Sequence, residues 1–344
     1  MPELYIAQKK MLTEKNSFFE HSKASLFIAE DEGKVVGRIA FVENLPHNNI
    51  YKEKTAFFGF FEVVERYEVA QLLFSRVFKL VKLHSYDKLV GPTNFTTNDT
   101  CGLLTSGFDI MPVILMPYNK KYYPDFLNRL GFEYEMGLSS YKIESTSLNS
   151  FLGKPVIQRI KNRVDKAGIL IRSIRYKDID NEILHLREIY NTSNLNNWGF
   201  IPLSENEFKN MAKDLKSLIP QSLILFAELN RKIIGFIVAL PDYNHVFKRI
   251  TRGRLFPFGL LKLIWYKHQI KSARILIMGI LQEYRNKGVD IMLYKQINEN
   301  LNQVGIFQAE ACYVMENNKS MNSILEKIGG SIIKKYKIYK IQLG

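Results

Sequence analysis

Residues 274–293 read Arg-Ile-Leu-Ile-Met-Gly-Ile-Leu-Gln-Glu-Tyr-Arg-Asn-Lys-Gly-Val-Asp-Ile-Met-Leu, and this stretch decides the fold. Its apolar first part predicts a buried strand from Arg274 to Leu281. After a turn that ends at Gly288, apolar residues recur every three to four positions as far as Val304. This spacing predicts an amphipathic helix that ends at Gly305. The chain therefore passes from a strand, through a glycine turn, into a helix.

The glycine turn is a candidate anion site. The first N–H groups of a helix have no partner within the helix, and the helix dipole favours negative charge beside them. Arg285 and Lys287 add positive charge to the turn. We therefore expect a pyrophosphate to fit here. The alternative is an ordinary turn with solvated basic residues, which is the more common case for an isolated Arg-x-x-Gly.

The chain contains an internal repeat. Residues 29–37 and 227–235 both predict a β-hairpin, and they are 198 positions apart. Residues 127–131 and 325–329 both predict a helix that ends at a glycine, and they are again 198 positions apart. A shared offset indicates a duplicated domain rather than a solenoid. The alternative is coincidence between two commonplace elements.

The predicted fold class is α/β, with two tandem domains over residues 1–150 and 151–344. The second copy has the order βααββ, a long insert, and then βαβαβ. Ser204 and Glu207 predict a capping box at the start of its second helix. Only 28 residues precede the hairpin of the first copy, so we expect its opening strand and helix to be shortened or missing.

On these residues the second copy resembles the GNAT superfamily of acyl-CoA N-acyltransferases. In that family a hairpin precedes a strand, an Arg/Gln-x-x-Gly-x-Gly/Ala turn and a helix, and an Asn-containing helix follows. The resemblance implies a mixed sheet flanked by helices and acyl-CoA as co-substrate, with the turn amides on its pyrophosphate. It places the thioester beside Ile280 and Leu281. The implied cofactor-binding residues are Ile280, Leu281, Arg285, Asn286, Lys287, Gly288, Val289 and Asn318.

The sequence departs from the family pattern at three positions. Asp290 stands where the family prefers Gly or Ala, and its carboxylate should repel a pyrophosphate. Leu325 replaces the tyrosine that often protonates the departing thiolate, and Gly330 replaces a terminal Phe. The first copy departs further, because residues 60–67 contain no glycine turn. We expect no CoA to bind at that position of the first copy.

Amide formation requires a neutral amine, so a base or a water relay is expected near the thioester. Glu310, on the strand beside the cofactor strand, is the first candidate, and Asp242, at the end of the hairpin, is the second. The alternative for each is a structural carboxylate held in a hydrogen bond at a strand end.

The insert combines aromatic and apolar residues with flanking cations between Arg252 and Lys267. This composition fits a segment in the interface of an anionic membrane, or the wall of an acyl-chain tunnel. A helix packed in a groove between the domains is the alternative. The candidate substrate-binding residues come from this insert and from two polar stretches, and they are Asn94, Asn98, Asn197, Trp198, Phe256, Phe258 and Trp265.

As a whole, the chain resembles the two-domain bacterial GNAT-like proteins that include the bacterial ceramide synthases. The resemblance rests on residues 57–62, 91–99, 197–200 and 254–259. It implies transfer of a long-chain acyl group to a lipid amine such as a sphingoid base. Two alternatives remain: an acyltransferase acting on a soluble amine, and a non-catalytic acyl-CoA-binding module.

Composition limits the partners. The formal net charge of +14 indicates a polyanionic partner such as a phosphorylated cofactor or an anionic membrane surface, or else only a lysine-rich surface. No recognition motif supports nucleic acid, and the six histidines lack metal-ligand spacing. The two cysteines and the lack of a signal-sequence pattern predict a cytoplasmic protein. The inner face of the cytoplasmic membrane is the alternative location.

Overall fold

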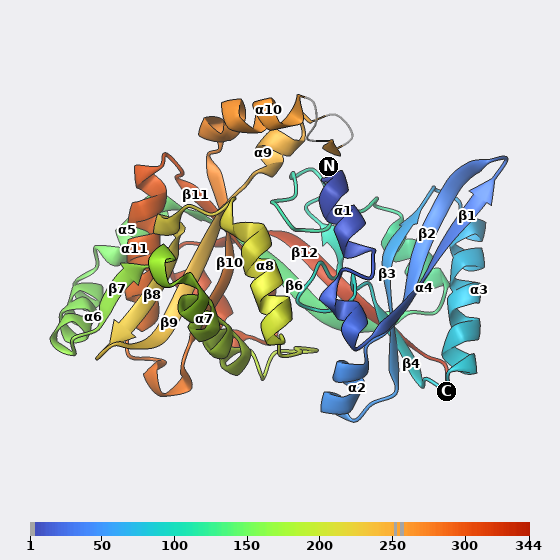
Figure 1. Ribbon diagram of the computed structural model, residues 1–344, viewed down its shortest axis with the longest axis horizontal. Coiled ribbons are helices and arrows are strands. Elements are labelled where there is room, and N and C mark those ends of the chain that lie inside the picture. Colours follow the sequence, from blue (N-terminus) through green and yellow to red (C-terminus); the bar gives the residue numbers. More distant parts are fainter. Residues whose placement is uncertain (1–3, 251–252, 255–257) are drawn as a thin grey trace. The chain divides into compact units, whose positions relative to one another are not determined.

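The computed structural model describes residues 4–250, 253–254 and 258–344 (Figure 1). Two compact units form. The N-terminal unit comprises residues 6–139, 198–201 and 333–344, and the C-terminal unit comprises residues 1–5, 140–197 and 202–332. The C-terminal unit therefore already includes residues 140–150, and the N-terminal unit includes two segments beyond residue 150. The domain boundary at residue 150 remains a prediction from the sequence repeat.

The first half of the chain supplies one set of helices and strands. They are α1 (Tyr5–Met11), η1 (Ser17–Glu20), β1 (Lys23–Asp31), β2 (Lys34–Glu43), α2 (Leu45–Tyr51), β3 (Thr55–Val63), α3 (Tyr67–Leu83), β4 (Lys88–Gly91), β5 (Leu103–Ser106), α4 (Tyr123–Arg129) and β6 (Glu133–Glu144). In the N-terminal unit the strand order is β1-β2-β3-β4-β12, and β5 also pairs with β12 (Ser331–Gln342). Among residues 4–22, which the structure describes, only α1 and η1 precede β1, so the opening elements are shortened as expected.

The second half repeats the pattern with additions. Its elements are α5 (Ser145–Leu152), α6 (Pro155–Lys166), β7 (Leu170–Ser173), η2 (Tyr176–Asp178), α7 (Ile179–Ser193), α8 (Glu205–Lys216), η3 (Gln221–Leu223), β8 (Ile224–Leu229), β9 (Lys232–Pro241), α9 (Asn244–Phe247), α10 (Gly259–Tyr266), η5 (Lys267–Gln269), β10 (Ser272–Ile280), η6 (Gln282–Tyr284), α11 (Val289–Gln303), β11 (Gln308–Met315) and α12 (Lys319–Lys327). The capping box at Ser204 and Glu207 is present at the start of α8, as predicted.

The internal repeat is confirmed by the element bounds. β9 begins and ends 198 residues after β2, from 34 to 232 and from 43 to 241. β12 likewise begins and ends 198 residues after β6, from 133 to 331 and from 144 to 342. Local hydrophobic patterning and turn chemistry are duplicated together with the chain, so both halves form the same elements.

The sheet of the C-terminal unit carries the candidate site. Its strand order is β7-β8-β9-β10-β11, and every pair is antiparallel except β10 with β11. Helices α7 and α8 lie side by side over β9 and β10 (Figure 1), and α11 packs against β8 and β9. The predicted α/β class is confirmed. The insert forms α9 and α10 between β9 and β10.

Candidate active site

The parallel strands β10 and β11 stop pairing halfway along their length. Their register runs from Ser272 with Gln308 to Ile275 with Ala311, although β10 continues to Ile280. At the same point β10 has a bulge opposite β9, because the register shifts between Ile275 and Ile277. Residues 275–278 stay half-buried in the middle of a central strand. The edge of β10 that follows Ile275, called the open edge below, therefore has backbone groups that β11 does not pair.

The predicted turn follows the open edge and leads into α11. Asn286 and Gly288 both have positive φ values, 59° and 87°. Gly288 is the N-cap of α11 and has no side-chain cap hydrogen bond. N–H groups at a helix start, next to left-handed residues, can form a concave anion site, and here the Asp290 carboxylate accepts those of Asp290 and Ile291. Lys287 is exposed beside it, with its ammonium 5.2 Å from the centre of the Tyr284 ring.

Arg285 holds this turn in place. Its Nε donates to the carbonyl of Ile280 at 3.2 Å, and its guanidinium also donates to the carbonyl of Ser193 at 3.0 Å. The side chain therefore joins the end of β10 to the end of α7. The local packing is equally tight at Gly288, where an added Cβ would lie 2.2 Å from Cγ2 of Ile160 on α6. Only glycine fits here, because of both the positive φ and this close approach.

Asp290 lies in the first turn of α11 and is half-buried. Burial raises the pKa of its carboxyl group, and hydrogen bonds from the backbone N–H groups of Ile291 and Asp290 oppose that rise. The carboxylate therefore engages N–H groups that a bound pyrophosphate would also use.

The two candidate bases lie at the paired end of β10 and β11. Glu310 is opposite Arg274 in the register, is buried, and accepts a hydrogen bond from the hydroxyl of Ser140. Arg274 donates to the carbonyl of Cys312 at 3.2 Å. Partners in a strand pair point to the same face. On β9, Val238 faces α7 and α8, and Leu240 lies on the same face because it is two residues further along. Arg274 pairs with Leu240, so Arg274 and its other partner Glu310 also lie on the face that α7 and α8 cover.

Asp242 is buried at the end of β9, beside the start of β10. Its carboxylate accepts the N–H of Asn244 at 3.2 Å and lies 3.5 Å from both Nε2 of His245 and Oγ of Ser272. His245 and Ser272 are 3.1 Å apart. Sequence reasoning missed His245 and Arg274. The signal for Arg274 was a charged residue inside an otherwise apolar strand, whereas nothing local marked His245.

Two positions after β11 have structural roles. The side chain of Asn318 caps α12 by accepting the N–H of Met321 at 3.1 Å. Leu325, in the place of the expected tyrosine, is buried. A nearby hydroxyl comes instead from Tyr141, which donates to Oδ1 of Asn322 at 2.8 Å.

In the first copy, the corresponding strands β3 and β4 also stop pairing partway along their length. There, however, a later segment of the same chain forms hydrogen bonds with the unpaired edge of β3. β3 pairs with β4 only from Thr55 to Phe57. Beyond that point the N–H of Thr93 donates to Phe58 at 2.8 Å, and Asn94 accepts the N–H of Phe60 at 2.8 Å. The turn between β3 and α3 has only residues 64–66, whereas residues 281–288 separate β10 from α11. This arrangement leaves no equivalent of the open edge in the first copy.

The candidate substrate residues of the N-terminal unit hold its loops together. Asn94 also donates to Thr100 at 2.7 Å, and Asn98 donates to the carbonyl of Ile201 at 2.9 Å. The indole of Trp198 donates to Glu135 at 3.1 Å. In the C-terminal unit, Asn197 donates to Asn194 at 2.7 Å.

The insert presents an exposed apolar helix. In and beside α10, Phe258 is 68% exposed, Leu261 62%, Ile264 55% and Trp265 78%. Phe256 lies outside the described residues. Among the described residues, no helix combines the length and apolarity needed to cross a membrane, and no cluster of three potential metal ligands occurs.

Comparisons with known proteins add the family context. No protein-family model matches the chain. Protein YghO of Escherichia coli (strain K12) is 30% identical over 349 residues, which cover 100% of this chain and 88% of that protein. The bacterial ceramide synthase of Caulobacter vibrioides (strain NA1000 / CB15N) is 31% identical over 345 residues, which cover 98% and 88%.

Solved structures agree on the fold. A tandem GNAT protein from the clavulanic acid biosynthesis pathway has a TM-score of 0.53 at 12% identity, covering 94% of this chain and 84% of its own. A GCN5-related N-acetyltransferase from Sphaerobacter thermophilus has a TM-score of 0.52 at 10% identity, covering 93% and 81%. At these identities the similarity establishes the tandem GNAT fold.

Proposed function

The chain belongs to the GNAT-type N-acyltransferase family of the bacterial ceramide synthase and protein YghO, and on that premise we propose that it transfers a long-chain acyl group from acyl-CoA to the amine of a lipid, such as a sphingoid base. One observation carries the proposal: the open edge of β10 begins after Ile275 and leads, through a turn, to a helix that starts at the left-handed Gly288. A ceramide is an N-acylated sphingoid base, which suggests the acceptor by analogy with the relative of that name.

The residues present fit acyl-CoA. In our proposal the pyrophosphate binds the N–H groups at the start of α11, displacing the Asp290 carboxylate from those of Asp290 and Ile291, with Lys287 supplying charge. The backbone of the open edge pairs with the amides of the pantetheine arm. Each strand residue spans about 3.3 Å, so the five residues from Leu276 to Ile280 offer about 17 Å of edge. This length puts the thioester nearer to Ile277 than to Ile280 and Leu281.

Our proposal gives Glu310 and Asp242 the proton transfers of the reaction. The amine nitrogen attacks the thioester carbonyl carbon, the C–S bond breaks, and the amine gives up a proton. We assign Glu310 as its acceptor, directly or through water, because its carboxylate lies beside the end of the paired segment. Asp242 would orient His245 at the same end of the sheet. Leu325 cannot protonate the leaving thiolate, so that proton comes from another group or from solvent.

The acceptor would come from a membrane surface. The insert leaves the sheet at Asp242 and returns at Ser272, next to both carboxylates. Its exposed apolar side chains, including Leu261 and Trp265, are flanked by Lys262 and Lys267. A short helix with exposed aromatic and aliphatic groups and nearby lysines suits the interface of an anionic bilayer. The proposal therefore favours membrane docking over a tunnel wall for this segment.

The test is a direct assay of the purified chain with sphinganine in anionic vesicles. Palmitoyl-CoA and acetyl-CoA are supplied separately, free thiol is measured, and the N-acyl product is identified by mass spectrometry. We expect N-palmitoylsphinganine. Activity only with a soluble amine, such as a lysine peptide, would refute the lipid acceptor. Binding of acyl-CoA without turnover of any amine would indicate a non-catalytic module.

A further inference from the structure

A cavity of about 260 Å³ lies within the C-terminal unit, between helices α7 and α8 and one face of the sheet. Figure 1 shows these two helices together in front of β9 and β10. The lining is mostly apolar and includes Ile183 from α7, Met211 and Ala212 from α8, Val238 from β9, and Leu276 and Ile277 from β10. Exposed Asp180, Lys213 and Lys216 also line the space, so it opens to solvent on one side.

The sheet side of the cavity is the bulge of β10. Leu276 is the extra residue between Ile275 and Ile277, where β10 also stops pairing with β11. Both Leu276 and Ile277 are half-buried, because their side chains border this space. The cavity thus adjoins the stretch of β10 where the proposed thioester would lie.

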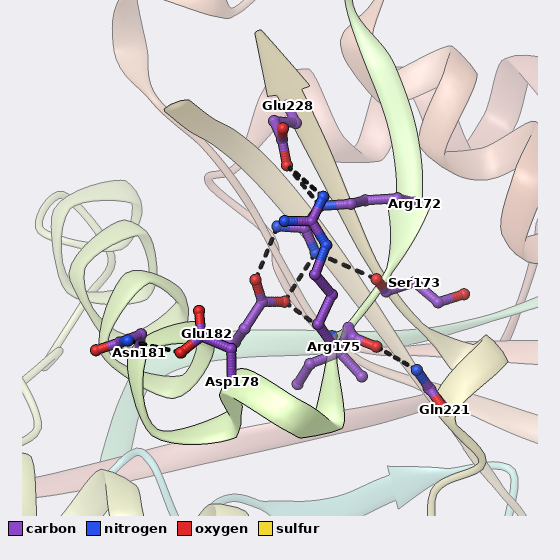
Figure 2. A network of polar contacts seen from close by, with 9 residues as sticks. Arg172, Ser173, Arg175, Asp178, Asn181, Glu182, Gln221 and Glu228 are labelled. Atoms are coloured by element: carbon purple, nitrogen blue, oxygen red, sulfur yellow. Dashed lines mark hydrogen bonds and ion pairs between the residues drawn. The ribbon is translucent and has the colours of Figure 1, made fainter. Parts of the chain in front are cut away.

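The helix side of the cavity is held by a buried ionic network (Figure 2). The guanidinium of Arg172 donates twice to Glu182 at 2.8 Å and once to Glu228 at 2.5 Å. Glu182 also accepts the N–H of Arg175 at 3.0 Å. Glu182 lies in the first turn of α7, next to Ile183 in the wall. The network fixes this end of α7 to β7 and β8, so the helix cannot simply settle onto the sheet and close the space.

We propose that this cavity binds the acyl chain of the acyl-CoA substrate, an inference that rests on the proposed acyltransferase function. The acyl carbons continue directly from the thioester, so they start at β10, and β10 forms the floor of the cavity. A water molecule takes about 30 Å³ and a methylene group is similar in size, so the space holds about nine methylene groups. The tail of a lipid amine is less suited, because the amine approaches from the Asp242 end of the strands.

The experiment is calorimetry of the full chain with CoA and a series of acyl-CoA esters from two to sixteen carbons, below their micellar concentrations. Affinity should rise by about fourfold for each added methylene, the equivalent of about 0.8 kcal/mol, and level off after about nine. Ala212→Phe fills the cavity from α8, and Ile183→Phe fills it from α7. Asn210→Phe is the matched control, because Asn210 is exposed on α8 and does not line the cavity.

The filled variants should bind CoA with the wild-type affinity. Their affinity for acyl-CoA should rise much less with acyl-chain length, with a loss of about fourfold for each methylene excluded from the cavity. Thermal unfolding of each variant identifies any that fails to fold, and the two walls provide independent variants. Wild-type affinity that does not depend on chain length would overturn the inference and leave the CoA site standing. Failure to bind CoA itself would instead refute the proposed function. If the filled variants lose sphinganine binding but keep the wild-type dependence on acyl-chain length, the cavity binds the acceptor. That result would also overturn the inference.

Discussion

Glu310 lies on β11 opposite Arg274, buried and hydrogen-bonded to Ser140, on the face of the sheet that α7 and α8 cover. We propose that the acceptor amine approaches this carboxylate at the end of the paired strands. Asp242 lies at the same end, but its carboxylate is engaged by the N–H of Asn244. The two carboxylates should therefore contribute unequally.

We expect Glu310→Gln to lower kcat by about 10²- to 10⁴-fold, the usual contribution of a general base. The amide can still bond to Ser140, so affinity for palmitoyl-CoA should not change. Asp242→Asn is the matched variant, and a larger loss of kcat in that variant than in Glu310→Gln would exchange the two roles.

Lys287 is an exposed cation beside the start of α11. Lys287→Ala should weaken CoA binding by about fivefold, because a charge pair at 4 Å in water is worth about 1 kcal/mol. The loss should shrink as salt rises. Calorimetry at two ionic strengths measures both effects, with the exposed Lys177→Ala as control. Gly288 is a poor site for this test, because any side chain there would collide with Ile160.

At the scale of elements, α7 depends on a few buried charges. Arg172 bridges Glu182 and Glu228, and Glu182 is only 3% exposed. Burial alone would raise the pKa of Glu182, but the hydrogen bonds from Arg172 and the Arg175 backbone outweigh it and lower the pKa. A lowered folded-state pKa means that Glu182 stabilises the fold above its ordinary value of 4.5. That contribution should be lost as the pH falls below this value.

Arg172→Ala should destabilise the protein by about 3–5 kcal/mol, because it leaves a buried carboxylate without its partner. Urea unfolding at neutral pH measures this loss, and the loss should shrink at acidic pH once Glu182 is protonated. Lys161→Ala is the control, since it removes an exposed ion pair with Asp165 worth at most about 1 kcal/mol. Equal losses for the two variants would contradict a buried network.

The exposed apolar helix α10 gives the second element-level prediction. Leu261→Glu with Trp265→Glu should abolish co-sedimentation with anionic vesicles, because both side chains are more than half exposed and would enter the interface. Unfolding free energy and affinity for CoA should stay unchanged. His185→Glu, an exposed position on α7, tests whether added negative charge alone causes release. Unchanged vesicle binding of the double variant would place the membrane contact elsewhere.

At the scale of the whole molecule, duplication has produced two copies with unlike sites. The second copy has an open strand edge and an eight-residue turn over residues 281–288. In the first copy, Thr93 and Asn94 bond to the edge of β3, and Gly59 lets the chain approach so closely that an added Cβ would lie 2.0 Å from the carbonyl oxygen of Thr93. In the first copy, residues of the chain itself thus form hydrogen bonds with the strand edge. In the second copy, β11 leaves the corresponding edge of β10 unpaired, and there we propose that the ligand binds.

We therefore expect one CoA per chain in a calorimetric titration. Asn94→Ala should cost about 1–3 kcal/mol of stability, because the N–H of Phe60 loses its acceptor. The CoA stoichiometry and dissociation constant should not change in this variant. A stoichiometry of two, with one site removed by Asn94→Ala, would show that the first copy also binds.

Local patterns were enough to predict several parts of this protein. The strand, turn and helix around Gly288, the capping box at Ser204 and the repeat at an offset of 198 follow from periodicity and turn chemistry, which act over a few residues. The same patterns carry the family resemblance, so the N-acyltransferase class could be inferred from the sequence.

Contacts between distant segments decided the rest. The bulge at Leu276, the attachment of Arg285 to the end of α7, the approach of α6 to Gly288 and the cavity beside β10 all join residues far apart in the chain. So does the filling of the first copy's edge by Thr93 and Asn94. No local pattern encodes these contacts, because each depends on how whole elements pack and which backbone groups that packing leaves unpaired.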